Sequence, residues 1–156
     1  MYNIEQLRHD DFPHARDSYY LNHAGISPLP QRSKREIQRV VEELAASPTD
    51  FFGRVGLPAM TALQAALASY INAAGPAEIT FVTSTSAAIN AIAQALPWQS
   101  GDNVLFCDVE FPSNAYPWMS LARDGVASRV VPADNGGLTL RAVEAGVDAH
   151  TRVVAA

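Results

Sequence analysis

Several kinds of residue are scarce in this sequence, and each shortage excludes a class of protein. A single cysteine, Cys107, rules out an internal disulfide framework and fits a reducing compartment. No apolar run approaches the roughly 20 residues that a membrane-spanning helix needs. The first residues also lack the basic region and apolar core of a secretory signal. We therefore expect a cytoplasmic protein that has no membrane partner.

Basic residues are few, and they do not form the runs that nucleic-acid binding requires. The formal net charge is −5. Four basic residues cluster between Arg32 and Arg39, but Glu36 lies among them and Glu42 follows, which is typical of a solvated helix face. We therefore expect no nucleic-acid partner. Lys34 is the only lysine, and this shortage bears on the chemistry considered below.

The first half of the chain predicts helices behind a lead-in arm. Residues 1–20 have no clear period, and 19–30 are a short extended piece followed by a loop rich in proline and glycine. Apolar residues at helical spacing predict an amphipathic helix over 31–46, then a loop over 47–58. Pro58 suits the first turn of a second helix. We assign residues 1–76 to an N-terminal arm with helices.

The second half alternates short apolar strands with helices, which predicts an α/β fold with a mainly parallel sheet covered by helices. The expected strands are 79–83, 103–107, 128–131 and one starting at 151, and the expected helices are 85–96, 114–123 and 138–146. The chain stops inside its last apolar strand, and a buried parallel strand normally needs a crossover to cover it. We therefore expect residues 77–156 to be an incomplete α/β domain at the start of a longer protein.

Three consecutive hydroxyl residues, Ser84, Thr85 and Ser86, lie where the predicted strand 79–83 turns into a helix. The first N–H groups of a helix have no intrahelical partner, and the helix dipole adds positive charge there, so this turn is suited to a phosphate. The nucleotide motifs G-x-x-x-x-G-K-S/T and G-x-G-x-x-G are both missing, which favours a compact phosphate monoester. Helix capping alone explains one of the hydroxyls, and both interpretations stay open.

A second loop with chemical potential follows the strand 103–107. Asp108, Glu110 and Phe111 come directly after the carboxyl end of that strand, and ligands of open α/β sheets bind along this edge. Phe111 is therefore placed to lie over a flat ring whose phosphate is held by residues 84–86. The alternative is that Phe111 belongs to the ordinary core.

Three segments together resemble the class V aminotransferase family of pyridoxal-phosphate (PLP) enzymes, which includes cysteine desulfurases, kynureninases and isopenicillin-N-epimerase-like proteins. "YYLNHAGISPLP" is similar to the family's opening segment, "ITFVTSTSAAIN" to its phosphate motif, and "VEFPSNAYPW" to its ring-stacking loop. The three motifs occur in the family's order, and the resemblance extends from about residue 19 to 156. It implies fold type I, with these residues forming the N-terminal part of the large domain.

The resemblance also implies a cofactor, a substrate class and site residues. The cofactor is PLP, the small-molecule substrate is an amino acid, and the intact protein is a homodimer. The phosphate-binding pair falls on Thr85 and Ser86, with Ser84 beside them in the same turn, and the ring-stacking position falls on Phe111. Asn22, His23 and Ala24 lie on the segment that lines the substrate side in the family.

The sequence departs from the family pattern at several positions of these motifs. Ser84 stands where the family has glycine, so a positive φ there would bring strain. Ala87 replaces a glutamate near the helix start. Phe111 replaces a histidine, which removes an acid–base group, weakens the interpretation as a desulfurase and favours the epimerase-like or kynureninase-like members.

No catalytic residue is assigned to this chain. The resemblance places the Schiff-base lysine, the carboxylate on the ring nitrogen and the substrate arginine beyond residue 156, and Lys34 reads as a solvated helix residue. The four histidines lack metal-ligand spacing, so we expect no metal site. We expect the parent protein to be an enzyme and this chain alone to be inactive. The alternatives are a catalytically silent fragment, a small module that binds a phosphate ligand or a partner, and an unrelated α/β domain.

Overall fold

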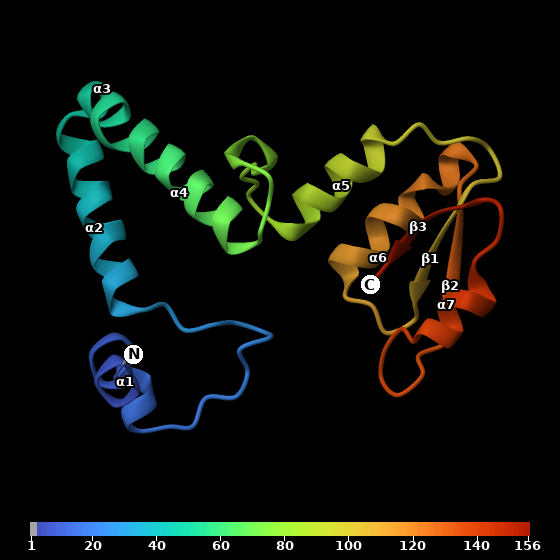
Figure 1. Ribbon diagram of the computed structural model, residues 1–156, viewed down its shortest axis with the longest axis horizontal. Helices are drawn as coiled ribbons and strands as arrows, with labels where there is room; N and C mark the ends of the chain where they lie inside the picture. The colour runs from blue at the N-terminus through green and yellow to red at the C-terminus, as the bar shows by residue number, and fades with distance from the viewer. Residues whose placement is uncertain (1–2) are drawn as a thin grey trace. The chain divides into compact units, whose positions relative to one another are not determined.

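The computed structural model describes residues 3–156, and residue contacts divide the chain into two compact units (Figure 1). The first unit ends at Ile79 and the second comprises Thr80–Ala156. Met1 and Tyr2, which belong to the predicted arm, lie outside the described residues. Across residues 3–156, no helix is both long and apolar enough to span a membrane. The expected division at residue 76 stays a prediction.

The first unit is entirely helical in its regular structure. The helix predicted over 31–46 and the one after it are confirmed, but four further helical elements occupy regions that were assigned to the arm and to a loop. The elements are α1 (Ile4–Asp11), the 3-10 helix η1 (Pro13–Arg16), α2 (Gln31–Ala46), α3 (Pro48–Phe51), the π-helix η2 (Phe52–Gly56), α4 (Leu57–Tyr70) and the 3-10 helix η3 (Pro76–Glu78).

The prediction of a loop over 47–58 is wrong, because the first residues of this segment favour a helix. Pro48 occupies the first turn of α3, where its fixed φ favours a helix and its missing N–H is not needed. The chain then continues through the π-helix η2 directly into α4, so Gly53 does not interrupt it. The arm likewise contains α1, because the Asn3 side chain accepts a hydrogen bond from the Gln6 N–H at 3.1 Å and caps the helix.

An ion pair joins α1 to the start of α2. Pro30, at the N-cap of α2, offers no side-chain cap, but the carboxylate of Asp11 accepts hydrogen bonds from the backbone N–H of Arg32 (3.2 Å) and from its Nε (2.6 Å). These hydrogen bonds from Arg32 lower the pKa of Asp11, although burial of the carboxylate opposes them. Asp11 therefore supplies, from another helix, an acceptor that the first turn of α2 lacks.

The apolar faces of the first unit are largely exposed. Among its described residues only Asp11 and Ala68 are buried. Apolar residues of α2 and α4 are between 46% and 60% exposed; they are Ile37, Val41, Leu44, Met60 and Leu63. The amphipathic pattern of α2 is therefore real, but the described residues do not cover it.

The second unit is a layered α/β structure. Its three strands form a parallel sheet in the order β2-β1-β3, which confirms the α/β fold class and the mainly parallel sheet. The elements are α5 (Thr85–Ala95), β1 (Asn103–Cys107), α6 (Pro112–Met119), the 3-10 helix η4 (Ser120–Asp124), β2 (Ala127–Val131), α7 (Leu140–Gly146) and β3 (Thr151–Ala155).

The strand predicted over 79–83 is wrong. Ile79 has extended backbone angles (φ −106°, ψ 123°), so the local preference was read correctly. The segment nevertheless joins none of the ladders of the sheet in the described part of the chain. A strand needs a hydrogen-bonded neighbour as well as an extended backbone, and neighbours cannot be read from a short apolar run.

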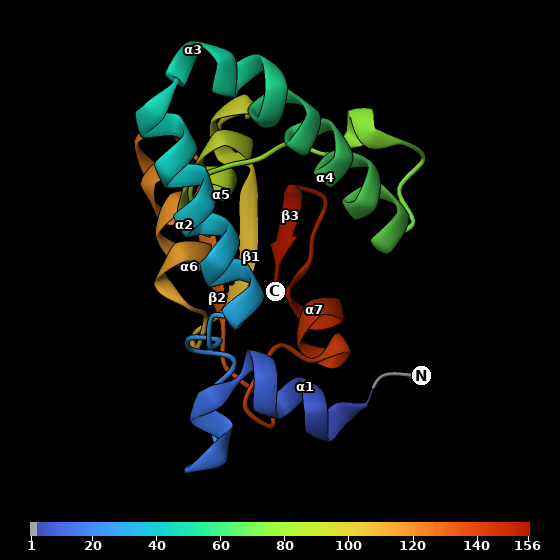
Figure 2. The same ribbon diagram turned by 90° about the vertical axis from the view of Figure 1, so that its left-hand side faces the viewer.

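Helices cover both faces of the sheet (Figure 2). On one face Val104 and Phe106 of β1 pack with Ala93 of α5 and Trp118 of α6 in the main core cluster. Alternation along β1 turns Leu105 to the other face, where it lies against Gly146 of α7. The central strand β1 is buried along its whole length, as expected for a parallel strand covered on both sides.

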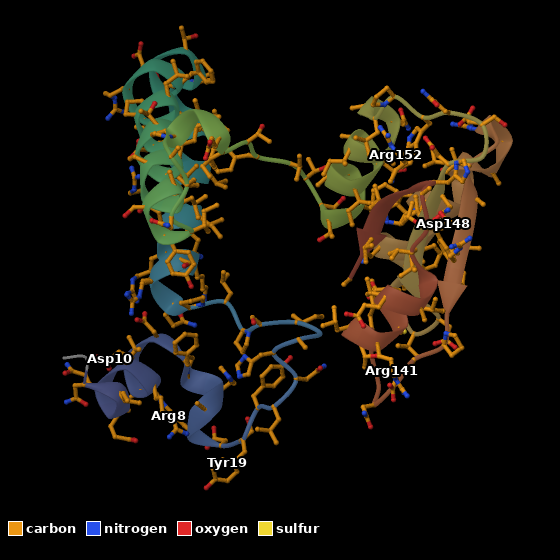
Figure 3. All side chains as sticks on the ribbon, turned by 45° about the vertical axis from the view of Figure 1, so that its right-hand side comes forward. Arg8, Asp10, Tyr19, Arg141, Asp148 and Arg152 are labelled. Carbon is orange, nitrogen blue, oxygen red and sulfur yellow. The ribbon has the colours of Figure 1, made fainter. Side chains whose placement is uncertain are left out.

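A polar network around Asp148 fastens the three strands at the edge where they begin. One oxygen of its carboxylate accepts hydrogen bonds from the Asn103 amide and the His150 N–H, both at 2.9 Å. The other oxygen forms an ion pair with Arg129 at 2.6 Å. Led by the Asn103 hydrogen bond, these donors lower the pKa of Asp148 to about 2. Figure 3 shows Asp148 within the second unit.

Replacing Gly146 by alanine should destabilise the second unit by about 1–3 kcal/mol, because a Cβ atom would collide with Leu105 and come within 3.2 Å of Val131. Both tryptophans, Trp98 and Trp118, lie in this unit, so urea unfolding followed by tryptophan fluorescence reports on it. The control is Gly137→Ala, where a Cβ meets nothing within 4 Å. Equal unfolding midpoints for the two variants would show that α7 does not pack closely on the sheet.

The second unit should also lose stability in acid through Asp148. Its pKa in the folded state, about 2, is below the ordinary value of 3.8, so the stabilisation is complete above the ordinary value and is lost as the pH falls toward 2. In urea unfolding at a series of pH values, wild type should exceed Asp148→Asn by a constant margin above about pH 5, and this margin should shrink toward pH 2. A margin that is independent of pH would contradict the ion-pair network.

Candidate cofactor site

The topology of the second unit brings the starts of two helices to one edge of the sheet. Helix α6 connects β1 to the parallel strand β2 and therefore runs antiparallel to them, so it begins at the carboxyl end of β1. The two helices pack against each other, and Figure 1 shows them starting at the same end. This is the edge at which the sequence predicts a ligand.

At the start of α5 the three hydroxyl residues divide their roles. Ser84 is the N-cap, and its Oγ accepts a hydrogen bond from the Ala87 N–H at 3.1 Å. Its φ of −164° is ordinary extended backbone, so the serine that replaces the family's glycine brings no strain. Thr85 and Ser86 are exposed, and their hydroxyls have no hydrogen-bond partner within residues 3–156. Capping therefore explains Ser84 but not the other two.

Ser86 and Phe111 line one open pocket of about 320 Å³. Phe111 is the N-cap residue of α6 and is 74% exposed, so the alternative that it belongs to the core is wrong. The pocket lies wholly in the second unit, between the first turns of α5 and one face of α6. All of its lining residues are uncharged; they are Ser86, Asn90, Phe111, Pro112, Ser113, Tyr116, Pro117 and Ser120.

Hydrogen bonds fix the loop that presents Phe111. The Asn114 amide donates to the Glu110 carboxylate at 2.8 Å, and the Trp118 indole donates to the Asn114 side chain at 3.3 Å. Asp108 accepts a hydrogen bond from the Ala133 N–H at 2.8 Å. Both acidic residues of this loop therefore have structural roles, and the loop holds Phe111 without contributing an acid–base pair.

The predicted substrate-side residues Asn22, His23 and Ala24 lie in the first unit, whereas Ser86 and Phe111 lie in the second. Their segment has a defined local structure. The Tyr20 hydroxyl donates to the Asn22 carbonyl at 3.2 Å, and the rings of Tyr20 and His23 pack edge to face with centroids 5.1 Å apart. A Cβ at Gly25 would come within 2.7 Å of the Asn22 side chain, which would have to move to make room for it.

Two further expectations concern residues outside the pocket. Lys34 is exposed on α2, in the first unit, and Cys107 is buried at the end of β1. The described residues include no group of three or more His, Cys, Asp or Glu side chains that is placed to hold a metal ion.

The contribution of α6 and the start of η4 to the pocket was not predicted from the sequence. Ser113, Tyr116, Pro117 and Ser120 follow one another at helical spacing of i, i+3, i+4 and i+7. This periodicity is visible in the sequence. This set of residues gives no amphipathic signal, because it contains both polar and apolar side chains.

Several known proteins are similar to this chain. The family model for aminotransferase class-V matches residues 19–156. A probable cysteine desulfurase from Methanothermobacter thermautotrophicus is 37% identical over 148 residues, which cover 92% of this chain and 37% of that protein. A cysteine desulfurase from Pectobacterium carotovorum is 33% identical over 168 residues, covering 99% of this chain and 41% of that protein.

A solved structure also matches the fold. It is a lysine-to-alanine mutant of C-DES with glycine covalently linked to its PLP cofactor, and it superimposes with a TM-score of 0.80 at 25% sequence identity. The match covers 94% of this chain and 39% of that protein, so the chain spans about two fifths of the length of these relatives. The matched family model, over residues 19–156, shows that this chain belongs to the class V aminotransferase family.

Proposed function

We propose that this chain is the cofactor-holding, N-terminal part of a PLP-dependent enzyme that acts on an amino acid. The observation that carries the proposal is the shared pocket, which joins Ser86 at the start of α5 to an exposed Phe111 at the start of α6. A matched structure that holds glycine linked to PLP supports the same cofactor and substrate class.

The start of α5 fits a phosphate group. Ser84 satisfies one N–H of the first turn, which leaves the backbone N–H groups and the hydroxyls of Thr85 and Ser86 as donors. These donors lie at the positive end of the helix dipole, where a compact dianion is stabilised. In this proposal Thr85 and Ser86 bind the phosphate, and Ser84 shapes the turn that presents them.

Phe111 fits the face of a flat ring. Its exposed side chain can stack on a pyridine ring, which contributes about 0.5–1.5 kcal/mol beyond simple burial. When bound, PLP supplies an electron sink for carbanion chemistry. Phe111 can neither donate nor accept a proton, and the pocket is lined by uncharged residues, so this chain positions the cofactor and leaves proton transfer to other groups.

The remaining parts of the active site come from other segments in this proposal. Asn22, His23 and Ala24 contribute the substrate side, and the Schiff-base lysine belongs to a region that the two-fifths span does not include. The exposed position of Lys34 on α2 supports this assignment. The chain alone is accordingly inactive. Transamination, epimerisation and lyase chemistry are all compatible with the pocket.

We also propose that the intact protein is a homodimer that uses no membrane or nucleic-acid partner. The uncovered apolar side of α2, with Ile37, Val41 and Leu44 about half exposed, supports a larger assembly in which this face is buried. The net charge of −5 is consistent with the lack of a nucleic-acid partner. A cytoplasmic location fits the single cysteine.

The division of roles at the start of α5 predicts different effects on stability. Ser84→Ala removes the N-cap and should lower the free energy of unfolding by about 1 kcal/mol. Ser86→Ala removes an exposed hydroxyl that has no partner in the described part of the chain, so it should change that free energy by less than about 0.5 kcal/mol. Urea unfolding with tryptophan fluorescence measures both, and equal losses would contradict the division.

Ligand binding tests the proposed function directly. Pyridoxine 5′-phosphate lacks the aldehyde and cannot form an adduct with Lys34, so its affinity, measured by isothermal titration calorimetry, reports on the pocket alone. Loss of one hydrogen bond to a charged phosphate should make Ser86→Ala bind about tenfold more weakly. Phe111→Ala should weaken binding by a smaller factor, through lost stacking.

Matched measurements make the result specific. Pyridoxine, which has no phosphate, should bind weakly and should not distinguish Ser86→Ala from wild type. Ser128→Ala, a serine change on β2 outside the pocket, should bind like wild type. Equal affinity of wild type and Ser86→Ala for pyridoxine 5′-phosphate would mean that α5 is merely capped, and the proposal would fail.

A further inference from the structure

The pocket extends beyond the two residues assigned to the cofactor. Its wall continues along α6 through Ser113 and Tyr116 to Ser120 at the start of η4, and Asn90 lines it from α5. These residues have no role in binding the phosphate or stacking on the ring in the proposed function. Their hydrogen-bonding state therefore shows what else the pocket can hold.

Pro117 changes the hydrogen bonding of this wall. It lies inside α6 and has no N–H, so it cannot donate the usual helical hydrogen bond to the carbonyl of Ser113, four residues earlier. Ser120 does not compensate, because its hydroxyl donates to the carbonyl of Pro117 at 2.7 Å. Ser113 and Pro117 both line the pocket, and the Ser113 carbonyl lacks its usual helical donor.

Asn90 adds a second acceptor. Its side-chain amide lies 2.8 Å from the carbonyl oxygen of Ser86, and a carbonyl can only accept, so the group facing it must be the NH₂. The Asn90 Oδ1 atom is then left as an acceptor, and it has no donor within the described residues. The orientation of this amide follows from its partner.

Tyr116 completes the set. It is 65% exposed, and its hydroxyl has no hydrogen-bond partner in the part of the chain that the structure describes. A phenol can both donate and accept, so Tyr116 can orient a polar group in the pocket. The lining contains no charged residue, so a carboxylate placed against this wall would have no cation to offset its lost hydration.

We propose that Tyr116 is a specificity-determining residue. Together with the Ser113 carbonyl and Asn90 Oδ1, it binds an uncharged amino-acid side chain that donates a hydrogen bond, and this wall disfavours a carboxylate side chain. The inference rests on the proposed function, because it places the substrate next to a cofactor held by Ser86 and Phe111.

The test uses two stable probes that join cofactor and substrate, the reduced adducts N-(5′-phosphopyridoxyl)-L-asparagine and N-(5′-phosphopyridoxyl)-L-aspartate. They have nearly the same shape, but the first has an amide donor where the second has a carboxylate. By calorimetry, wild type should bind the asparagine adduct about tenfold more tightly than the aspartate adduct, since only the amide satisfies the acceptors.

Two variants assign the preference to its residues. Tyr116→Phe removes only the hydroxyl and should reduce the preference severalfold, whereas Tyr70→Phe, at an 87% exposed position in the first unit, should leave it unchanged. Pro117→Ala restores an N–H that can bond to the Ser113 carbonyl, so it should also reduce the preference. Far-UV circular dichroism and the affinity for pyridoxine 5′-phosphate check that each variant is folded.

The outcomes separate this inference from the proposed function. If pyridoxine 5′-phosphate binds and Ser86→Ala weakens it, but the two adducts bind equally, the inference is overturned and the proposed function stands. An unchanged preference in Tyr116→Phe removes the role given to Tyr116. If neither the adducts nor pyridoxine 5′-phosphate bind, both fail.

Discussion

Parallel pairing of β1 with its two neighbours is the constraint on which the candidate site depends. The register of β1 with β2 and β3 gives the sheet one carboxyl edge, and the covering helices must then begin there. Ser86 and Phe111 are 25 positions apart in the sequence, yet they line one pocket because α5 and α6 pack together and begin at the same end. The first turns of the helices thus supply the polar groups of the site, and the strands contribute the packed core.

How much of the fold is readable from the sequence depends on whether a feature is local. The central strand was predicted with its observed bounds, Asn103–Cys107, because a short apolar run between turn signals is a local pattern. The segment 79–83 was not, because its extended backbone lacks a paired neighbour, and pairing is a long-range property. The helical path through 48–56 was missed because its glycines mimic a loop, although Pro48 starts a helix.

The same distinction applies to the candidate site. Its position is predicted from local signals for the carboxyl edge, namely hydroxyls at a helix start and an aromatic residue after a buried strand. The roles of the three hydroxyls are not, because only the backbone angles reveal that Ser84 is turned toward the Ala87 N–H. The face of α6 that includes Tyr116 became recognisable only once α5 and α6 were seen to pack together.

The contact between Asp11 and Arg32 has a consequence for how the chain can be shortened. The arm precedes the region that matches the family, so it looks dispensable in a sequence comparison. Its carboxylate is nevertheless the acceptor for a main-chain donor in the first turn of a helix 21 positions further along. Deleting the arm would thus remove this acceptor and fray α2 from its first turn, so a deletion outside the family match would destabilise a helix inside it.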